Sequence, residues 1–138
     1  MGLDAVFGTR VVQDASEVFE YSLGQKPPEG ITPLNGYGRF HFGGNSAWFQ
    51  FKATPAAIEK LVKSLEMKDD SEMLSSDEKG QVKGAGFIYD KDLKEMPWWN
   101  LKYQEGMKHY RYYNDGTEYN LYYYPENGMC FIIYSSTH

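Results

Sequence analysis

The sequence predicts an α+β fold, a single domain over residues 1–138, with a mostly antiparallel sheet of about five strands and two helices packed on one face. Two apolar helical patterns are flanked by capping residues, and two alternating aromatic segments are joined by a glycine-rich turn. The last third carries two turn sequences between tyrosine-rich segments. With 41% hydrophobic residues, a chain of 138 residues can bury one core.

The first expected helix covers residues 14–23. Asp14 can accept hydrogen bonds from the amides of the first turn, and Glu17 follows three residues later, as in a capping box. Gly24 favours a left-handed stop, and Pro27 and Pro28 prevent the helix from continuing. The helix is short, so we expect it to depend on packing against the rest of the chain.

An aromatic hairpin is expected next, with strands near residues 31–42 and 47–53 around a Gly-Gly-Asn turn. Side chains alternate between the faces of a strand, so one face of the hairpin is predicted to be apolar and the other polar. The core face would hold Phe40, Phe42, Phe49 and Phe51. The face toward water would hold Arg39, His41, Trp48, Gln50 and Lys52.

The second helix begins at Thr54, an N-cap residue, with Pro55 at the first helical position. An apolar stripe at helical spacing follows, which we expect to lie across the phenylalanine face of the sheet: Ile58, Leu61, Val62 and Leu65.

Residues 68–95 are rich in acidic side chains, serine and glycine, and are predicted to form a long polar loop or excursion. Within it, residues 87–89 form an apolar triplet that suggests a short edge strand. The bulky segment that follows, residues 96–100, contains the adjacent Trp98 and Trp99. We expect these two indoles to close an open end of the core.

Residues 108–136 are predicted to form a three-stranded meander with turns at residues 114–116 and 125–128. A two-residue loop at Asp115–Gly116 segregates polar side chains best, and it pairs Tyr112 with Tyr119. The alternative is a three-residue loop with a bulge, in which the first strand directs its other set of side chains toward the core. In the favoured register one face holds Tyr110, Tyr112, Tyr119, Leu121, Tyr123, Cys130, Ile132 and Tyr134. The last strand is apolar on both faces, which predicts an interior strand.

Several kinds of chemistry have no support in the sequence. Cys130 is the single cysteine and sits in an apolar strand, so it is expected to be an inert core residue. The histidines His41, His109 and His138 show no metal-ligand spacing, and no phosphate loop is present, so no metal or cofactor is predicted. A net charge of -5 disfavours nucleic acid as a partner.

No apolar run is long enough for a transmembrane segment, and the first residues lack the features of a secretory signal. The expected location is cytoplasmic as the chain stands. It is exported or lipid-anchored if the N-terminus was trimmed.

The aromatic content, 17% of the chain with 12 tyrosines, exceeds what one core face requires. Surplus Tyr and Trp are typical of binding surfaces. We therefore predict a non-enzymatic binding or interaction module that takes a protein or a small ligand. Its candidate contact residues are Trp98, Trp99, Tyr122 and Tyr124, with His109 and Arg111 as polar neighbours.

Two alternative functions stay open. One is a small acid/base hydrolase or isomerase that pairs His109 or His41 with a carboxylate such as Glu118, which shares a predicted sheet face with His109. The other is a purely structural domain.

The order of features resembles that of small bacterial α+β domains of no assigned function, some of them exported or lipid-anchored. The residues that carry the resemblance are the helix end at Gly24, the strand Trp48–Phe49–Gln50–Phe51, the helix around residues 58–61, the Pro97–Trp98–Trp99 segment and the tyrosine-rich hairpin. The resemblance implies one α+β domain and export as one possible location. It implies no catalytic residue.

Overall fold

Seven antiparallel strands form one sheet in a computed structural model that describes residues 8–137. The strand order is β1-β2-β3-β7-β6-β5-β4, so the last strand in the chain lies at the centre of the sheet. The strands are β1 (Arg10–Val12), β2 (Ile31–His41), β3 (Gly44–Ala53), β4 (Lys68–Asp69), β5 (Lys108–Asn114), β6 (Thr117–Tyr124) and β7 (Met129–Thr137).

The α+β class and the antiparallel sheet are confirmed, but the sheet has two more strands than the sequence predicts. The additional strands are β1, with three residues, and β4, with two, and each forms one edge of the sheet. Segments this short are too brief to show the alternation by which a strand is recognised in a sequence.

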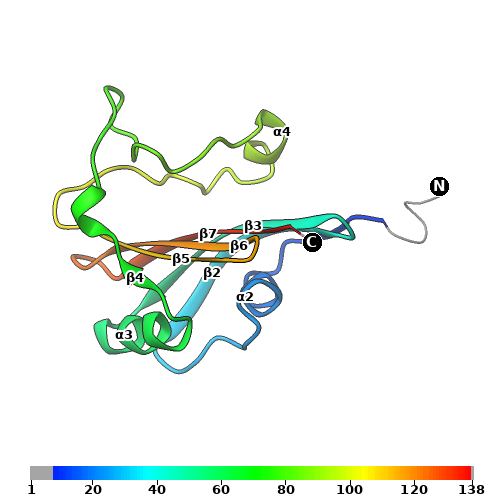
Figure 1. The fold of residues 1–138 in the computed structure, drawn as a ribbon, viewed down its shortest axis with the longest axis horizontal. Helices are drawn as coiled ribbons and strands as arrows, with labels where there is room; N and C mark the ends of the chain where they lie inside the picture. The colour runs from blue at the N-terminus through cyan, green and yellow to red at the C-terminus, as the bar shows by residue number, and fades with distance from the viewer. Residues whose placement is uncertain (1–7, 138) are drawn as a thin grey trace.

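Two helices cover one face of the sheet, as predicted. Figure 1 shows α2 (Ala15–Leu23) and α3 (Pro55–Ser64) on the same side, below the strands. Asp14 accepts a hydrogen bond from the Glu17 amide at 3.0 Å, and Thr54 caps α3 by accepting from the Ala57 amide at 3.2 Å.

The core under these helices contains the phenylalanines expected there except Phe42. Phe19 of α2 packs edge-on against Phe49 and Phe51 of β3, with ring centroids 5.7 and 5.5 Å apart. Phe40 lies against this core, but Phe42 is 79% exposed, because β2 ends at His41. The expectation that Phe42 belongs to the core was therefore wrong.

The register predicted for the meander is confirmed. Tyr112 pairs with Tyr119 across a two-residue turn, and Asp115 and Gly116 both have positive φ angles. β7 lies between β3 and β6, which explains why it is apolar on both faces. Of the eight residues predicted to share one face, five are buried in the core beneath α2 and α3, and Tyr110, Tyr112 and Tyr119 are partly buried against it.

A segment between β4 and β5 covers the other face of the sheet. It contains the 3-10 helix η1 (Ser71–Met73) and a third α-helix, α4 (Asp90–Leu93), and Figure 1 shows it above the strands. We call residues 70–107 the cover segment. Because the cover lies over this face, Trp48 is 7% exposed and Gln50 is also buried. The expectation that both face water was wrong.

One buried ion pair joins the cover segment to the sheet. The Asp92 side chain is 1% exposed and accepts hydrogen bonds from Arg39 Nε and Nη2 of β2, each at 3.0 Å. Its Oδ1 also accepts from the Tyr37 hydroxyl at 3.1 Å. Residues 87–89, expected as an edge strand, form no strand in the structure and lead instead into α4.

Candidate functional site

The two adjacent indoles lie on the covered face, and both are half-buried. The Trp98 and Trp99 rings meet edge-on with centroids 5.9 Å apart. Trp99 also packs edge-on against Phe131 of β7, at 5.2 Å. The pair therefore packs on the middle of the sheet, with part of each ring left accessible.

The two tyrosines predicted as contact residues are more deeply placed. Tyr122 is 2% exposed and Tyr124 is 7% exposed, and both pack in the core between the sheet and the cover segment. Burial raises the pKa of Tyr122 to about 12. A surface that meets a partner cannot be built on Tyr122, whereas Tyr124 lines a pocket described below.

His109 and Arg111 belong to a polar network on β5 and β6. The His109 ring stacks on Tyr122 at 4.4 Å, and its Nε2 lies 2.8 Å from Asn120 Oδ1. Glu118 accepts from Asn120 Nδ2 at 3.0 Å and from Arg111 Nε at 2.8 Å. Asn120 and Glu118 thus connect His109 to Arg111 through hydrogen bonds.

The electrostatics of Glu118 follow from these contacts. Burial raises the pKa of this carboxyl, but hydrogen bonds from Asn120 and Arg111 and the Arg111 charge outweigh it, so the pKa is lowered overall. Glu118 is therefore held as a carboxylate.

His109 and Glu118, the pair named for an acid/base site, are not hydrogen-bonded to each other. Asn120 stands between His109 and Glu118, and the carboxylate near His109 Nδ1 is Asp70, with Oδ2 at 3.9 Å. His41 is exposed on β2, and His138 lies outside the described residues. Over residues 8–137, no cluster of three or more His, Cys, Asp or Glu side chains is placed to hold a metal ion.

Cys130 is fully buried in β7, and burial raises the pKa of its thiol well above the usual value. A thiol in this state is a poor nucleophile. The position of Cys130 in the structure is therefore that of a core residue, as the sequence predicts.

Two neighbouring aromatic side chains of the cover segment are exposed. Phe87 is 79% exposed and Tyr89 is 61% exposed, and their rings meet edge-on at 5.1 Å. Leu93 of α4 is 39% exposed, and the two half-buried indoles follow in the chain. We call Phe87 and Tyr89 the aromatic patch.

A hollow of about 530 Å³ opens beside the patch. Its walls combine side chains of the cover segment with Ile133 of β7, and Gly84 and Gly86 contribute bare backbone. The apolar wall residues are Val82, Ala85, Ile88, Leu93, Trp99, Leu101 and Ile133.

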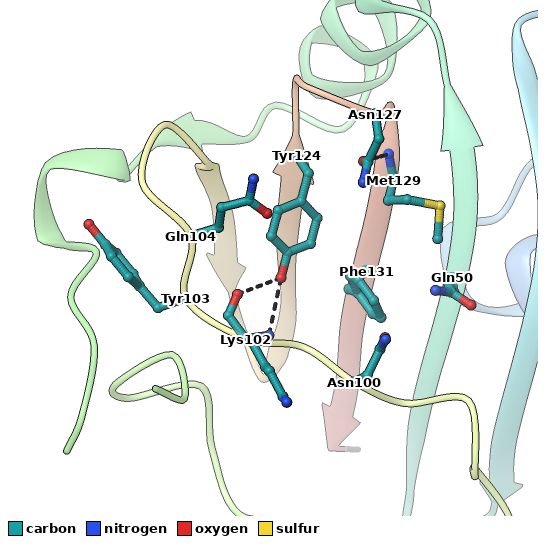
Figure 2. A pocket seen from close by; sticks show the side chains of 9 residues that line it. All are labelled: Gln50, Asn100, Lys102, Tyr103, Gln104, Tyr124, Asn127, Met129 and Phe131. Carbon is teal, nitrogen blue, oxygen red and sulfur yellow. Dashed lines mark hydrogen bonds between the residues drawn. The ribbon is translucent and has the colours of Figure 1, made fainter. Parts of the chain in front are cut away.

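A second, more polar pocket lies on the same face of the sheet (Figure 2), with a volume of about 200 Å³. Phe131 and Met129 of β7 and Tyr124 of β6 contribute its apolar part. The Tyr124 hydroxyl donates to the Lys102 carbonyl at 2.6 Å and accepts from the Lys102 amide at 3.1 Å, so it fixes the chain that forms one wall. The polar lining residues are Gln50, Asn100, Lys102, Tyr103, Gln104 and Asn127.

The sequence indicated some of these residues and missed others. The apolar triplet at residues 87–89 was visible, but interpreting it as a strand hid the exposure of Phe87 and Tyr89. Gln50 was placed among water-facing side chains because it alternates with Phe49 and Phe51. Nothing local signals that the cover segment turns it into a pocket wall.

No family model, curated protein or solved structure matches this chain. Within the described residues, no helix is long and apolar enough to cross a membrane.

Proposed function

We propose that this protein is a non-enzymatic interaction module that docks an extended peptide segment of a protein partner on the aromatic patch. The single observation that carries the proposal is the pair Phe87 and Tyr89, two large aromatic side chains that are exposed and in edge-on contact. Gly86 and Ile88, which alternate with them in the chain, line the hollow.

The exposure of this pair is unfavourable for the isolated chain. Burying one Phe side chain contributes about 1.5–3 kcal/mol, and that contribution is forgone at Phe87. Neighbouring exposed apolar side chains mark interaction sites more often than isolated ones do. The patch therefore supports a role in recognition.

The hollow supports an extended peptide as the occupant. Its apolar walls suit a large aliphatic or aromatic side chain, and Gly84 and Gly86 leave backbone groups accessible to another main chain. Both glycines have positive φ angles and nothing within 4 Å of an added Cβ, so the loop there is open.

The experiment is a selection of displayed random peptides against the whole protein. The wild type is expected to enrich peptides that contain a bulky apolar residue. The double variant Phe87→Ser, Tyr89→Ser is expected to lose that enrichment. Both side chains are exposed, so the free energy of unfolding should change by no more than about 0.5 kcal/mol per substitution.

Phe42→Ser is the matched control, because Phe42 has the same 79% exposure as Phe87 and lies at the turn between β2 and β3. It is expected to bind the selected peptides as the wild type does. The proposal fails if no peptide is enriched, or if the double variant binds the selected peptides with wild-type affinity.

A further inference from the structure

Gln50 places a hydrogen-bond donor at the polar pocket. Its side chain is 7% exposed, and its Oε1 accepts from Asn35 Nδ2 at 2.8 Å, which fixes the orientation of the amide. Nε2 consequently points away from Asn35, and Figure 2 shows it directed toward Phe131. No group among residues 8–137 hydrogen-bonds to this nitrogen, so it is available as a donor to a molecule in the pocket.

Further donors converge on the same space. Figure 2 shows the Asn100 amide nitrogen directed at the Phe131 side of the pocket, across from Gln50. Asn127 uses its Oδ1 to accept from the Met129 amide at 2.9 Å, which leaves its Nδ2 as a donor. Gln50 and Asn100 therefore place two amide donors on the Phe131 side of the pocket, and this part of the pocket is complementary to a ligand with two acceptor oxygens.

Two lysines near the pocket can attract an anion. Lys102 lies on the rim, and Lys52 is exposed two residues beyond Gln50 on the same face of β3. Neither lysine forms an ion pair with the described part of the chain. The nearby Glu126 carboxylate is held by Gln104 Nε2 at 2.6 Å.

We infer that this pocket is a binding site for a small carboxylate. The carboxylate oxygens accept from Gln50 Nε2 and Asn100 Nδ2, and the apolar part of the ligand rests against Phe131. A volume of about 200 Å³ is below the range of drug-sized pockets, so the ligand has the size of a single ring or an amino acid. The inference does not rest on the aromatic patch.

The test is a titration of the ¹⁵N-labelled full chain with sodium benzoate, followed by NMR of the side-chain amides. Benzoate is expected to shift the Gln50 and Asn100 NH₂ signals at millimolar concentration, and added salt should weaken the effect. Benzamide, with the same ring and no charge, is expected to bind at least about tenfold more weakly, because hydrogen bonds to a charged acceptor are stronger.

Two variants make the result specific to the pocket. Asn100→Ala removes one donor from an exposed position and is expected to weaken benzoate binding about tenfold. Gln50→Glu keeps an oxygen for Asn35 but replaces the donor with a negative charge, and is expected to abolish binding. Asn114→Ala, at the exposed end of β5, is the control with wild-type affinity.

The inference is overturned if the Gln50 and Asn100 signals do not move, if benzamide binds as well as benzoate, or if Asn100→Ala keeps wild-type affinity. The Phe87→Ser, Tyr89→Ser variant is expected to bind benzoate normally, so a failure here is distinguishable from a failure of the peptide-docking proposal.

Discussion

Tyr123 and its neighbour Tyr124 differ in how their hydroxyls are satisfied. Both rings are buried, on opposite faces of β6. The Tyr124 hydroxyl makes two hydrogen bonds with the Lys102 backbone, whereas the buried Tyr123 hydroxyl has no partner among the described residues. An unsatisfied buried hydroxyl is unfavourable, because it loses its bonds to water without replacing them.

Replacing each tyrosine by phenylalanine is therefore expected to change the free energy of unfolding in different ways. Tyr123→Phe should leave the free energy of unfolding unchanged or raise it by about 1 kcal/mol, because it removes only an unpaired group. Tyr124→Phe should lower it by about 1–3 kcal/mol, because it removes two hydrogen bonds between the Tyr124 hydroxyl and the Lys102 backbone. Urea unfolding monitored by circular dichroism measures both, and a larger loss for Tyr123→Phe would contradict the assignment.

At the scale of elements, α4 depends on its ion pair. A helix of four residues is not stable by itself, and α4 is held to β2 by Asp92 through Arg39 and Tyr37. Both partners come from the sheet, so the contact determines where the cover segment and its aromatic patch lie.

Asp92→Ala is expected to destabilise the protein by about 3–5 kcal/mol, because it leaves Arg39 partly buried without its counter-ion. Amide hydrogen exchange should accelerate first in residues 87–99, and tryptophan fluorescence should shift to the red. Asp90→Ala is the matched control, since Asp90 is exposed in the same helix. Equal effects of the two variants would show that Asp92 does not clamp the segment.

The elements that the sequence predicted best are those specified by local chemistry. Asp115–Gly116 selects a two-residue turn through two positive φ angles, and this turn sets the pairing of Tyr112 with Tyr119. Trp48 was misplaced for the opposite reason. Its polar neighbours Gln50 and Lys52 indicate a solvent face, and the burial of that face depends on a segment distant in the chain.

At the scale of the whole molecule, the tyrosines make stability depend on alkaline pH. Burial is the first cause that raises the pKa of each of them, and for Tyr122 the value rises from about 10 to about 12. The other tyrosines with raised pKa values are Tyr37, Tyr110, Tyr119, Tyr123 and Tyr124.

The sign of the pH effect follows from linkage. A raised pKa means that the folded state holds the proton more tightly, so this stability is complete below pH 10 and is lost as the pH rises toward 12. The raised pKa of Tyr122 alone corresponds to a loss of about 3 kcal/mol in the free energy of unfolding over this pH range. In a titration with base, the absorbance of tyrosinate should appear at the pH at which the circular dichroism of the fold is lost. Complete ionisation of the tyrosines at pH 10, while the circular dichroism stays native, would contradict this.

The candidate sites show why aromatic content alone predicts function incompletely. The surplus of rings is real, but much of it fills a second core between the sheet and the cover segment, as with Tyr122 and Phe131. The exposed rings, Phe87 and Tyr89, lie in a triplet that the sequence predicts as a short edge strand within a polar loop. The composition gives the number of aromatic residues, but whether each ring is buried or exposed depends on the tertiary fold.

The central position of β7 has a consequence for biosynthesis. A ribosome makes every other strand before β7, so the β2–β3 and β5–β6 hairpins emerge with an open seam between them. During that interval the edges of β3 and β6 that will pair with β7 have unpaired backbone groups, and Phe49, Phe51 and Leu121 lack the neighbours that bury them. The nascent protein therefore passes through a stage open to chaperones and to mispairing, which ends only when Met129–Thr137 clears the exit tunnel and closes the seam.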